Sequence, residues 1–421
     1  MNRLMLLFLV VLLVIAVMVP TVYFLNQAET GSASDEFFFG VTFGGNSISQ
    51  AKLLIDKIKK YSNLFIVNSW EICGAANETI LNEVCEYAVN AGLNVMVYFN
   101  FVYYNYTEDI GNIYNASSWD LHGVSPWHIE WLNNAMAKWG SKFLGAYLYD
   151  EPGGKQIDLG YWNGELMTGE PPAMFVNVTT YSQAATNYTL SLLQSGSMQH
   201  ITNSSIPNVV NSRVRVFTSD YALYWFDYLG GYDAVFAQLG GTGGINRKIQ
   251  QIALCRGSAT AQNSQWGTII IWTYNNPPYM EDADELLQDM MMSYQAGANY
   301  LIIFNYPYNS TSKSYGILSQ NHFNVMELFW SQIHDLPRGT PSHNSERVAF
   351  VLPKDYGWGM RRPDDSIWGL FPADKMSLQI WNNMNKLTEE YGVKLDIIYD
   401  DPQFNIASTY GEVYYWNSTI T

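Results

Sequence analysis

Along most of this chain, short runs of apolar, β-branched and aromatic residues alternate with longer amphipathic stretches, which indicates repeated strand–helix units. The runs predict eight strands, at residues 37–44, 64–70, 93–101, 143–150, 213–219, 232–239, 267–274 and 299–305. The amphipathic stretches predict helices at residues 48–61, 78–91, 127–142, 181–200, 246–255, 283–296 and 323–333. Eight such units over about 300 residues favour a (β/α)8 barrel, with a doubly wound open sheet as the alternative.

The pattern is interrupted at residues 336–341, where two prolines and a glycine are typical of a domain boundary. A second unit follows, with strands expected at 347–352, 394–399 and 413–416 and a helix at 377–391. We therefore expect a barrel domain over residues 35–338 and a small α/β domain over residues 345–421. This layout resembles family 42 β-galactosidases in architecture, and the resemblance implies a glutamine-amidotransferase-like C-terminal domain.

The N-terminus carries a membrane signal, because Arg3 precedes an uncharged, mostly apolar run from Leu4 to Leu25. A helix of roughly 22 residues can cross a hydrocarbon core and exceeds the usual core of a cleaved signal peptide. Residues 1–34 therefore predict a membrane-targeting helix, with a signal peptide cleaved near residues 32–34 as the alternative. Positive charge before the run and acidic residues after it place the rest of the chain outside the cytoplasm, membrane-anchored or secreted.

Glycosylation motifs agree with an exported protein. Asn-X-Ser/Thr sequons occur at Asn77, Asn105, Asn115, Asn177, Asn187, Asn203, Asn309 and Asn417. Chance would give about five, so their weight lies in agreeing with the leader. We expect several of them to carry glycans on surface loops.

Charge and composition restrict the partners. The formal net charge of −16 argues against nucleic acid or an acidic membrane surface as a ligand. Charged residues make up 14% of the chain and aromatic residues 15%, so uncharged polar and aromatic side chains must form much of the surface. Such a surface suits neutral, hydroxyl-rich ligands such as carbohydrate, although it is also common on exported proteins of acidic or hot habitats.

The cysteines and glycines predict no cofactor. Cys73 and Cys85 flank one loop and could form a disulfide outside the cell, leaving Cys255 as a small buried apolar residue. The chain has no CxxC or Cys/His cluster that would suggest a metal site. The glycine-rich run 240–244 lacks the Lys-Ser/Thr of a phosphate-binding loop, so no nucleotide is expected.

In a (β/α)8 barrel the chemistry lies at the carboxyl ends of the strands. The residues that close the predicted strands are mostly aromatic, amide or acidic, and a Trp or Tyr among them could equally be core. The candidate substrate-binding residues are Asn68, Trp70, Glu71, Asn100, Asp220, Gln238, Trp272, Tyr274, Asn305 and Tyr306. Aromatic faces can pack on sugar rings, while amides and carboxylates bind hydroxyl groups.

The sharpest local signal is the apolar strand 143–150, which ends in Asp150, Glu151 and Pro152. Proline favours an extended backbone at Glu151 and fixes the direction of this acid. A carboxyl group at the mouth of a partly apolar barrel has its pKa raised by desolvation and by a neighbouring charge, as a general acid requires. The alternative is a solvated acidic turn that closes a strand.

The Asp150-Glu151-Pro152 motif resembles two groups of (β/α)8-barrel enzymes. It is similar to the Asn-Glu-Pro that ends strand four of clan A glycoside hydrolases, and this resemblance implies that Glu151 is the acid/base. It also resembles the Asp-Glu pair of family 20 hexosaminidases, which implies that Asp150 orients a substrate acetamido group that itself attacks. The Gly-Gly that often precedes the family 20 pair is absent.

The chain departs from clan A at strand seven, where those enzymes carry a nucleophilic Glu. Here Trp272 and Tyr274 occupy this stretch. Glu281, a few residues later, is our candidate nucleophile, with Asp220 or Glu71 as other sources of a second carboxylate. Substrate assistance would remove the need for one.

The loop 354–365 contains Trp358 and several Arg and Asp residues. It could contribute to substrate binding, or it could form an interdomain contact through Arg–Asp pairs. Taken together, the sequence predicts an extracytoplasmic glycoside hydrolase that cleaves a cell-surface glycan by general acid/base catalysis. The alternative is a non-catalytic glycan-binding or cell-surface structural protein on a degenerate barrel.

Overall fold

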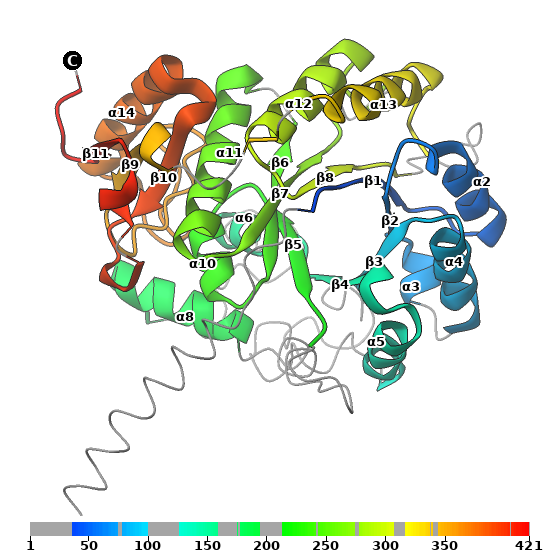
Figure 1. Ribbon diagram of the computed structural model, residues 1–421. Coiled ribbons are helices and arrows are strands. Elements are labelled where there is room, and N and C mark those ends of the chain that lie inside the picture. Colours follow the sequence, from blue (N-terminus) through cyan, green and yellow to red (C-terminus); the bar gives the residue numbers. More distant parts are fainter. Residues whose placement is uncertain are drawn as a thin grey trace, which may run out of the picture. The chain divides into compact units, whose positions relative to one another are not determined.

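Eight parallel strands close into a barrel (Figure 1). They are β1 (Phe38–Phe43), β2 (Leu64–Val67), β3 (Asn94–Phe99), β4 (Phe143–Leu148), β5 (Val216–Asp220), β6 (Ala234–Leu239), β7 (Gln265–Ile270) and β8 (Tyr300–Ile303). Strand β1 closes the sheet, because Gly40 lies opposite Leu64 of β2 on one side and Ile302 of β8 on the other. The predicted (β/α)8 barrel is confirmed, and a closed sheet excludes the doubly wound alternative.

The computed structural model describes residues 36–74, 78–99, 126–158, 175, 177–193, 213–240, 243–273, 278–306, 316–336, 338–339, 344–404 and 406–420. The predicted membrane-targeting helix over residues 1–34 lies outside these residues. In the part that is described, no helix has the length and apolar character needed to cross a membrane.

Ten helices are described along the barrel part of the chain. They are α2 (Ile48–Ile58), α3 (Trp70–Gly74), α4 (Glu78–Asn90), α5 (Pro126–Trp139), α6 (Pro152–Ile157), α8 (Tyr181–Leu193), α10 (Tyr224–Leu229), α11 (Gly244–Ala261), α12 (Ala283–Gln295) and α13 (Gln320–Ile333). Side-chain caps fix where some of them begin: Ser47 accepts the N–H of Gln50 before α2, and Asp282 accepts those of Asp284 and Glu285 before α12. The short helices α3, α6 and α10 were not predicted, because five or six residues show no helical periodicity.

The barrel interior is filled by aromatic and aliphatic side chains. Tyr300 lies at the centre of this packing, with ring-centroid distances of 5.1 Å to Phe38, 5.5 Å to Phe217 and 5.4 Å to Phe236. The rest of this interior cluster is formed by Leu64, Ile66, Met96, Leu144, Tyr147, Ala234, Ile269 and Ile302. The interior is therefore a packed core, and chemistry is confined to the strand ends.

A second, three-stranded parallel sheet follows the barrel in sequence, with the order β10-β9-β11. Its elements are β9 (Val348–Leu352), α14 (Lys375–Tyr391), β10 (Leu395–Tyr399) and β11 (Glu412–Tyr415). Short 3-10 turns occur at Gly140–Lys142, Asn344–Glu346, Gly392–Lys394, Pro402–Phe404 and Ala407–Thr409. The expected strands and helix of this region are present within two residues of their predicted bounds.

Helix α11 joins the two sheets, since it packs on β6 and β7 of the barrel and on β10. A Cβ at Gly257 would lie 2.3 Å from the backbone oxygen of Ile397, so only glycine allows this approach. Next to it, Arg256 Nε donates to Asp396 Oδ1 at 2.6 Å, in a buried ion pair. Residues Phe37–Thr421 thus form one compact unit.

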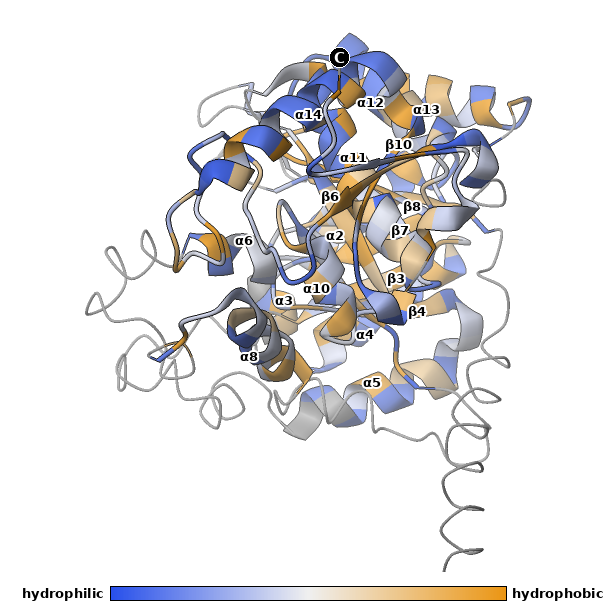
Figure 2. Ribbon diagram, turned by 90° about the vertical axis from the view of Figure 1, so that its left-hand side faces the viewer, coloured by the Kyte–Doolittle hydropathy of each residue, from blue (hydrophilic) through white to orange (hydrophobic). Residues whose placement is uncertain are grey.

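In Figure 2, β6 and β10 are mostly hydrophobic, whereas α14 alternates hydrophilic and hydrophobic residues.

The expected disulfide is not formed: Cys73, Cys85 and Cys255 are free, buried thiols. Cys73 lies on α3, where its thiol donates to the backbone oxygen of Val67 at 3.4 Å, and Cys85 packs from α4 into the core. Both act as small apolar side chains, and burial raises the pKa of Cys73 to about 12. Cys255 is buried, as expected.

Three sequons lie in the described part of the chain. Asn177 and Asn417 are exposed, and Asn187 lies within helix α8 rather than on a loop. The other five, at Asn77, Asn105, Asn115, Asn203 and Asn309, lie outside the described residues. Glycosylation stays a prediction.

Candidate active site

Glu151 lies between strand β4 and helix α6, at the carboxyl end of the barrel. Its backbone is left-handed (φ 55°, ψ 48°), and so is that of Tyr149 (φ 51°). The extended backbone expected before Pro152 is therefore wrong. The chain must turn from a strand into a helix within three residues, and two positive φ angles make this turn while the N–H of Glu151 donates to Ser219 O at 3.1 Å.

Gln238, at the end of β6, holds the carboxyl group of Glu151. Its Nε2 donates to Glu151 Oε1 at 2.7 Å and to Ser219 Oγ at 3.1 Å. Gln238 is buried while Glu151 is partly exposed. A neutral amide donor thus fixes the direction of the acid without adding a charge.

The neighbouring acid, Asp150, is bound by Tyr147, a residue of the barrel interior. Tyr147 donates its hydroxyl to Asp150 Oδ1 at 2.6 Å, and the same hydroxyl is 2.6 Å from Ser219 Oγ. The N–H of Ser219 donates to Tyr147 Oη at 3.0 Å. Burial and the charge of Asp150 keep the pKa of Tyr147 well above its usual value, so this hydroxyl stays protonated and donates.

Burial, followed by the charge of Asp150, raises the pKa of Glu151 to about 7. The charge of Asp158 also raises this pKa, whereas Lys155 and the hydrogen bond from Gln238 lower it. The carboxyl group is therefore divided between its two protonation states near neutral pH. It can donate a proton in one step and accept one in the next.

Asp220, expected to bind substrate, is fully buried and binds backbone instead. Its carboxylate accepts the N–H groups of Gly153 (2.6 Å), Gly154 (2.8 Å), Tyr221 (2.7 Å) and Ala222 (3.1 Å). Burial, together with the charge of Glu151, raises the pKa of Asp220 to about 7, although the hydrogen bonds from these N–H groups lower it. Asp220 thus caps helix α6 from behind Glu151.

Glu281, the candidate nucleophile, is fully buried in an ion cluster. Lys248 of α11 lies 2.9 Å from Glu281 Oε2 and 2.6 Å from Asp289 Oδ2 of α12. Burial, then the charge of Asp289, raises the pKa of Glu281 to about 8. In the described residues, the charged partners of Glu281 are Lys248, Glu285 and Asp289 rather than Glu151.

Aromatic rings gather at the ends of β7 and β8. Trp272 lies 6.0 Å from Phe304 and 6.4 Å from Tyr306 between ring centroids, and the rings of Phe304 and Tyr306 are parallel at 6.1 Å. Tyr306 is 36% exposed, while Trp272 and Phe304 are partly buried. These three rings offer the apolar surface that a sugar ring requires.

The remaining candidates divide into three groups. Asn305 is fully buried, and its Oδ1 accepts the N–H of Leu318 at 3.3 Å, so it holds a loop. Asn68 is partly exposed after β2, and Glu71 is exposed on α3, which begins at Trp70. Asn100 and Tyr274 lie outside the described residues.

Sequence reasoning missed Tyr147, Ser219 and Phe304, which surround or face the candidate site. Two-residue alternation places Ser219 on the same side of its strand as Phe217, and Phe304 on the same side as Ile302. It does not find Tyr147, because the preceding interior residue is Leu144 and the register of β3 and β4 shifts between them. In the described part of the chain, no group of three or more His, Cys, Asp or Glu residues could hold a metal ion.

No protein-family model and no curated protein matches this chain. Solved structures do resemble it. A GH5_18 protein from Streptomyces cattleya in complex with GlcNAc matches with a TM-score of 0.53 and 11% identity, covering 90% of this chain and 98% of that one. A GH5_18 variant from Bifidobacterium longum in complex with Manβ1-4GlcNAc matches with a TM-score of 0.52 and 9% identity, covering 91% and 96%. The chain therefore shares its fold, a (β/α)8 barrel with the C-terminal region included in the match, with the GH5_18 structures.

Proposed function

We propose that this protein is a glycoside hydrolase in which Glu151 is the general acid/base. The observation that carries the proposal is the placement of Glu151: a partly exposed carboxyl group at the carboxyl end of the barrel, bound by Gln238, with a pKa raised to about 7. The fold shared with GH5_18 structures supports it. So do the three aromatic rings at the ends of β7 and β8.

In this mechanism, Glu151 protonates the glycosidic oxygen as the bond to the anomeric carbon breaks. The resulting carboxylate then removes a proton from the water that attacks the anomeric carbon. The amide of Gln238 keeps the carboxyl group aimed during both steps.

We do not assign the second catalytic role to Glu281 or Asp220, because both carboxylates are buried and bound to other groups. We propose that the substrate supplies it. An acetamido oxygen attacks the anomeric carbon and forms a cyclic oxazolinium ion, while Asp150 accepts the amide N–H and balances the developing positive charge. The hydroxyl of Tyr147 supports this role, because it anchors one oxygen of Asp150 and leaves the other for the substrate.

The substrate class follows from this proposal: a β-linked glycan with a 2-acetamido sugar on the non-reducing side of the cleaved bond. GlcNAc and Manβ1-4GlcNAc, found in the similar structures, are ligands to test first for binding.

We further propose that the protein works outside the cytoplasm, anchored or secreted by residues 1–34. Intact-mass measurement of native material from the membrane or secreted fraction would show glycans, whereas an unmodified cytosolic polypeptide would contradict this location.

One observation favours a second candidate, a non-catalytic glycan-binding protein: the end of β7 carries Trp272 instead of an acid. The experiment that separates the two is hydrolysis of aryl β-glycosides that share one phenol leaving group and differ in the sugar, with N-acetyl-β-glucosaminide, β-mannoside and β-glucoside compared, beside binding of the same sugars by calorimetry. Turnover that Glu151→Gln abolishes supports the enzyme. Binding without turnover supports the second candidate. Glu83→Gln, at an exposed ion pair with Lys52, is the matched control.

A further inference from the structure

Helix α6 decides where Glu151 points, because it begins at the next residue. It has six residues, and a helix this short is not stable on its own. Whatever holds α6 therefore holds the acid. On the barrel side, Asp220 of β5 accepts the N–H groups of Gly153 and Gly154.

The other end of α6 is held by a loop from outside the barrel, residues 353–374 between β9 and α14. Ser366 Oγ donates to the backbone oxygen of Ile157 at 3.1 Å, and Gln156 Nε2 donates to that of Trp368 at 2.8 Å. A Cβ at Gly369, whose φ is +66°, would lie 2.1 Å from the backbone oxygen of Gln156. The loop and the helix are thus in backbone contact, with no room for a side chain between them.

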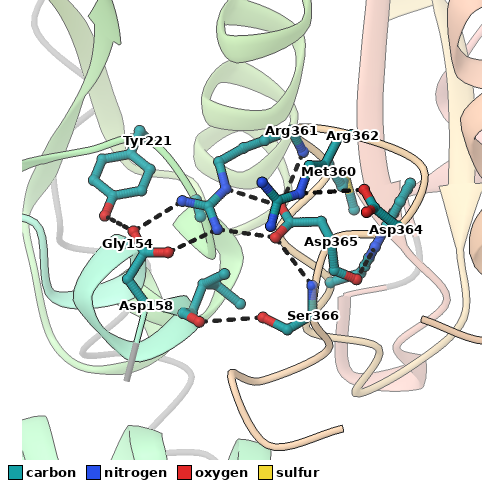
Figure 3. A network of polar contacts seen from close by, with 12 residues as sticks. Gly154, Asp158, Tyr221, Met360, Arg361, Arg362, Asp364, Asp365 and Ser366 are labelled. Carbon is teal, nitrogen blue, oxygen red and sulfur yellow. Dashed lines mark hydrogen bonds and ion pairs between the residues drawn. The ribbon is translucent and has the colours of Figure 1, made fainter. Parts of the chain in front are cut away.

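Arg361 of this loop makes the strongest link. Its Nη1 and Nη2 donate to the two carboxylate oxygens of Asp158, both at 2.8 Å, directly after α6 (Figure 3). The same guanidinium donates to Asp365 through Nε and Nη2, both at 2.9 Å. Tyr221, which follows β5, adds its hydroxyl to Asp158 Oδ2 at 2.6 Å. Two-point Arg–carboxylate contacts fix orientation as well as distance.

The link also acts through charge. The carboxylate of Asp158 is one of the charges that raise the pKa of Glu151, together with that of Asp150, and Lys155 opposes them. Asp220 lies on the β5 side of Glu151, and the charge of Glu151 is one of the causes that raise the pKa of Asp220. Arg361 balances Asp158, so its removal would expose Glu151 to an uncompensated negative charge.

We propose that the loop 353–374, which joins β9 to α14, positions Glu151 through helix α6, with Arg361 as the positioning residue. The catalytic meaning of this inference rests on the proposed function, whereas the contacts do not. It gives this loop, which follows the barrel in sequence, a role in the site without placing any of its residues on substrate. Among the Arg–Asp pairs that involve the loop 354–365, Arg361 binds both Asp365 of the loop and Asp158 next to α6.

The test replaces Arg361 by Gln in the full chain and uses two measurements that need no substrate. Hydrogen–deuterium exchange of residues 153–158 should become faster by about tenfold, because α6 loses its charged clamp. Carbon-13 NMR of protein labelled at the glutamate carboxyl groups, with Glu151→Gln identifying the signal, should show the pKa of Glu151 shifted upward. The matched control is Arg213→Gln, which removes a two-point pair with Asp233 (2.9 and 2.7 Å) before β5 and should change neither readout.

A double variant separates charge from geometry. In Arg361→Gln with Asp158→Asn, the charge of Asp158 that raises the pKa of Glu151 is gone. The pKa of Glu151 should then no longer lie above that of the unsubstituted protein, while exchange in α6 stays fast. If Arg361→Gln leaves both α6 exchange and the Glu151 titration unchanged, the positioning role is wrong, whether or not the protein hydrolyses glycans.

Activity adds a third measurement and keeps the two proposals distinguishable. For an active enzyme, Arg361→Gln should lower kcat by about tenfold with little change in KM, since the acid is misaligned and the sugar contacts are intact. The alkaline limb of the pH profile should move upward with the Glu151 titration. If no substrate is cleaved by the unsubstituted protein but both substrate-free readouts respond, the positioning role stands and the proposed function fails.

Discussion

Gln238 Nε2 lies 2.7 Å from Glu151 Oε1, so the ends of β6 and β4 are joined by a hydrogen bond from a neutral amide to the proposed acid. The bond favours the ionised carboxylate and is one of the contacts that lower the pKa of Glu151 against the effect of burial. It therefore sets both the direction and the acidity of the group.

Replacing Gln238 by Leu should remove the donor and raise the pKa of Glu151. Because a general acid must be protonated, the alkaline limb of the kcat/KM profile should shift to higher pH. Loss of orientation should lower kcat by about ten- to a hundredfold. The pH dependence of hydrolysis by Gln238→Leu provides the measurement. A shift of its alkaline limb to lower pH would contradict the role given to this bond.

Glu281→Gln should leave turnover within a few-fold of the unsubstituted protein, because this carboxyl group is bound to Lys248 in a buried cluster. The informative partner is Lys248→Met, which leaves the carboxyl groups of Glu281 and Asp289 without their cation and should cost about 3–5 kcal/mol of stability. Thermal unfolding and turnover are measured together. A loss of several orders of magnitude in Glu281→Gln, with rescue by azide, would instead identify Glu281 as a nucleophile.

Stability should fall as the pH rises from about 5 to 8. Burial raises the folded-state pKa of Glu151 and Asp220 to about 7 and that of Glu281 to about 8, so the folded protein binds more protons than the unfolded chain in this range. Glu151→Gln should remove one such contribution and gain about 2 kcal/mol of stability at pH 8. Urea unfolding at pH 5 and pH 8 provides the measurement, and an equal effect at both values would show that Glu151 is not desolvated.

Asp150→Asn should lose about a hundredfold or more in turnover of a 2-acetamido substrate, because the amide cannot balance the positive charge that develops on the acetamido group. Glu71→Gln is the matched comparison, an exposed acid after β2 whose replacement should be nearly silent. If Glu71→Gln abolishes activity and Asp150→Asn does not, the second carboxylate comes from α3, and substrate assistance is wrong.

The barrel could be predicted from sequence because most strands are apolar runs of four to six residues, and strand-like segments repeat eight times between amphipathic stretches. Asp150 and Glu151 could be found for the same reason: two acids that end an apolar strand are conspicuous. Helix α11 was predicted too short, because it packs on both sheets and buries polar residues such as Gln250, Arg256 and Ser258, so hydrophobic periodicity does not mark its extent.

Other parts of the site could not be predicted, because sequence does not show which acids are buried. Asp220 and Glu281 follow strands as catalytic acids do, yet Asp220 binds the N–H groups of α6 and Glu281 binds Lys248. Tyr147 and Ser219 look like ordinary strand residues until the closed barrel places their hydroxyl groups 2.6 Å apart. The free Cys73 and Cys85 show the same limit, since spacing along the chain does not determine where side chains point.

The central claim is tested most directly by comparing the unsubstituted protein with Glu151→Gln on two aryl glycosides that differ only in leaving-group acidity. The variant keeps the side-chain volume and removes the proton donor. It should lose at least about a thousandfold in kcat/KM on the 4-methylphenyl glycoside and much less on the 2,4-dinitrophenyl glycoside, whose leaving group needs no proton. Equal turnover by Glu151→Gln and the unsubstituted protein on both substrates would contradict the assignment of Glu151 as the acid/base.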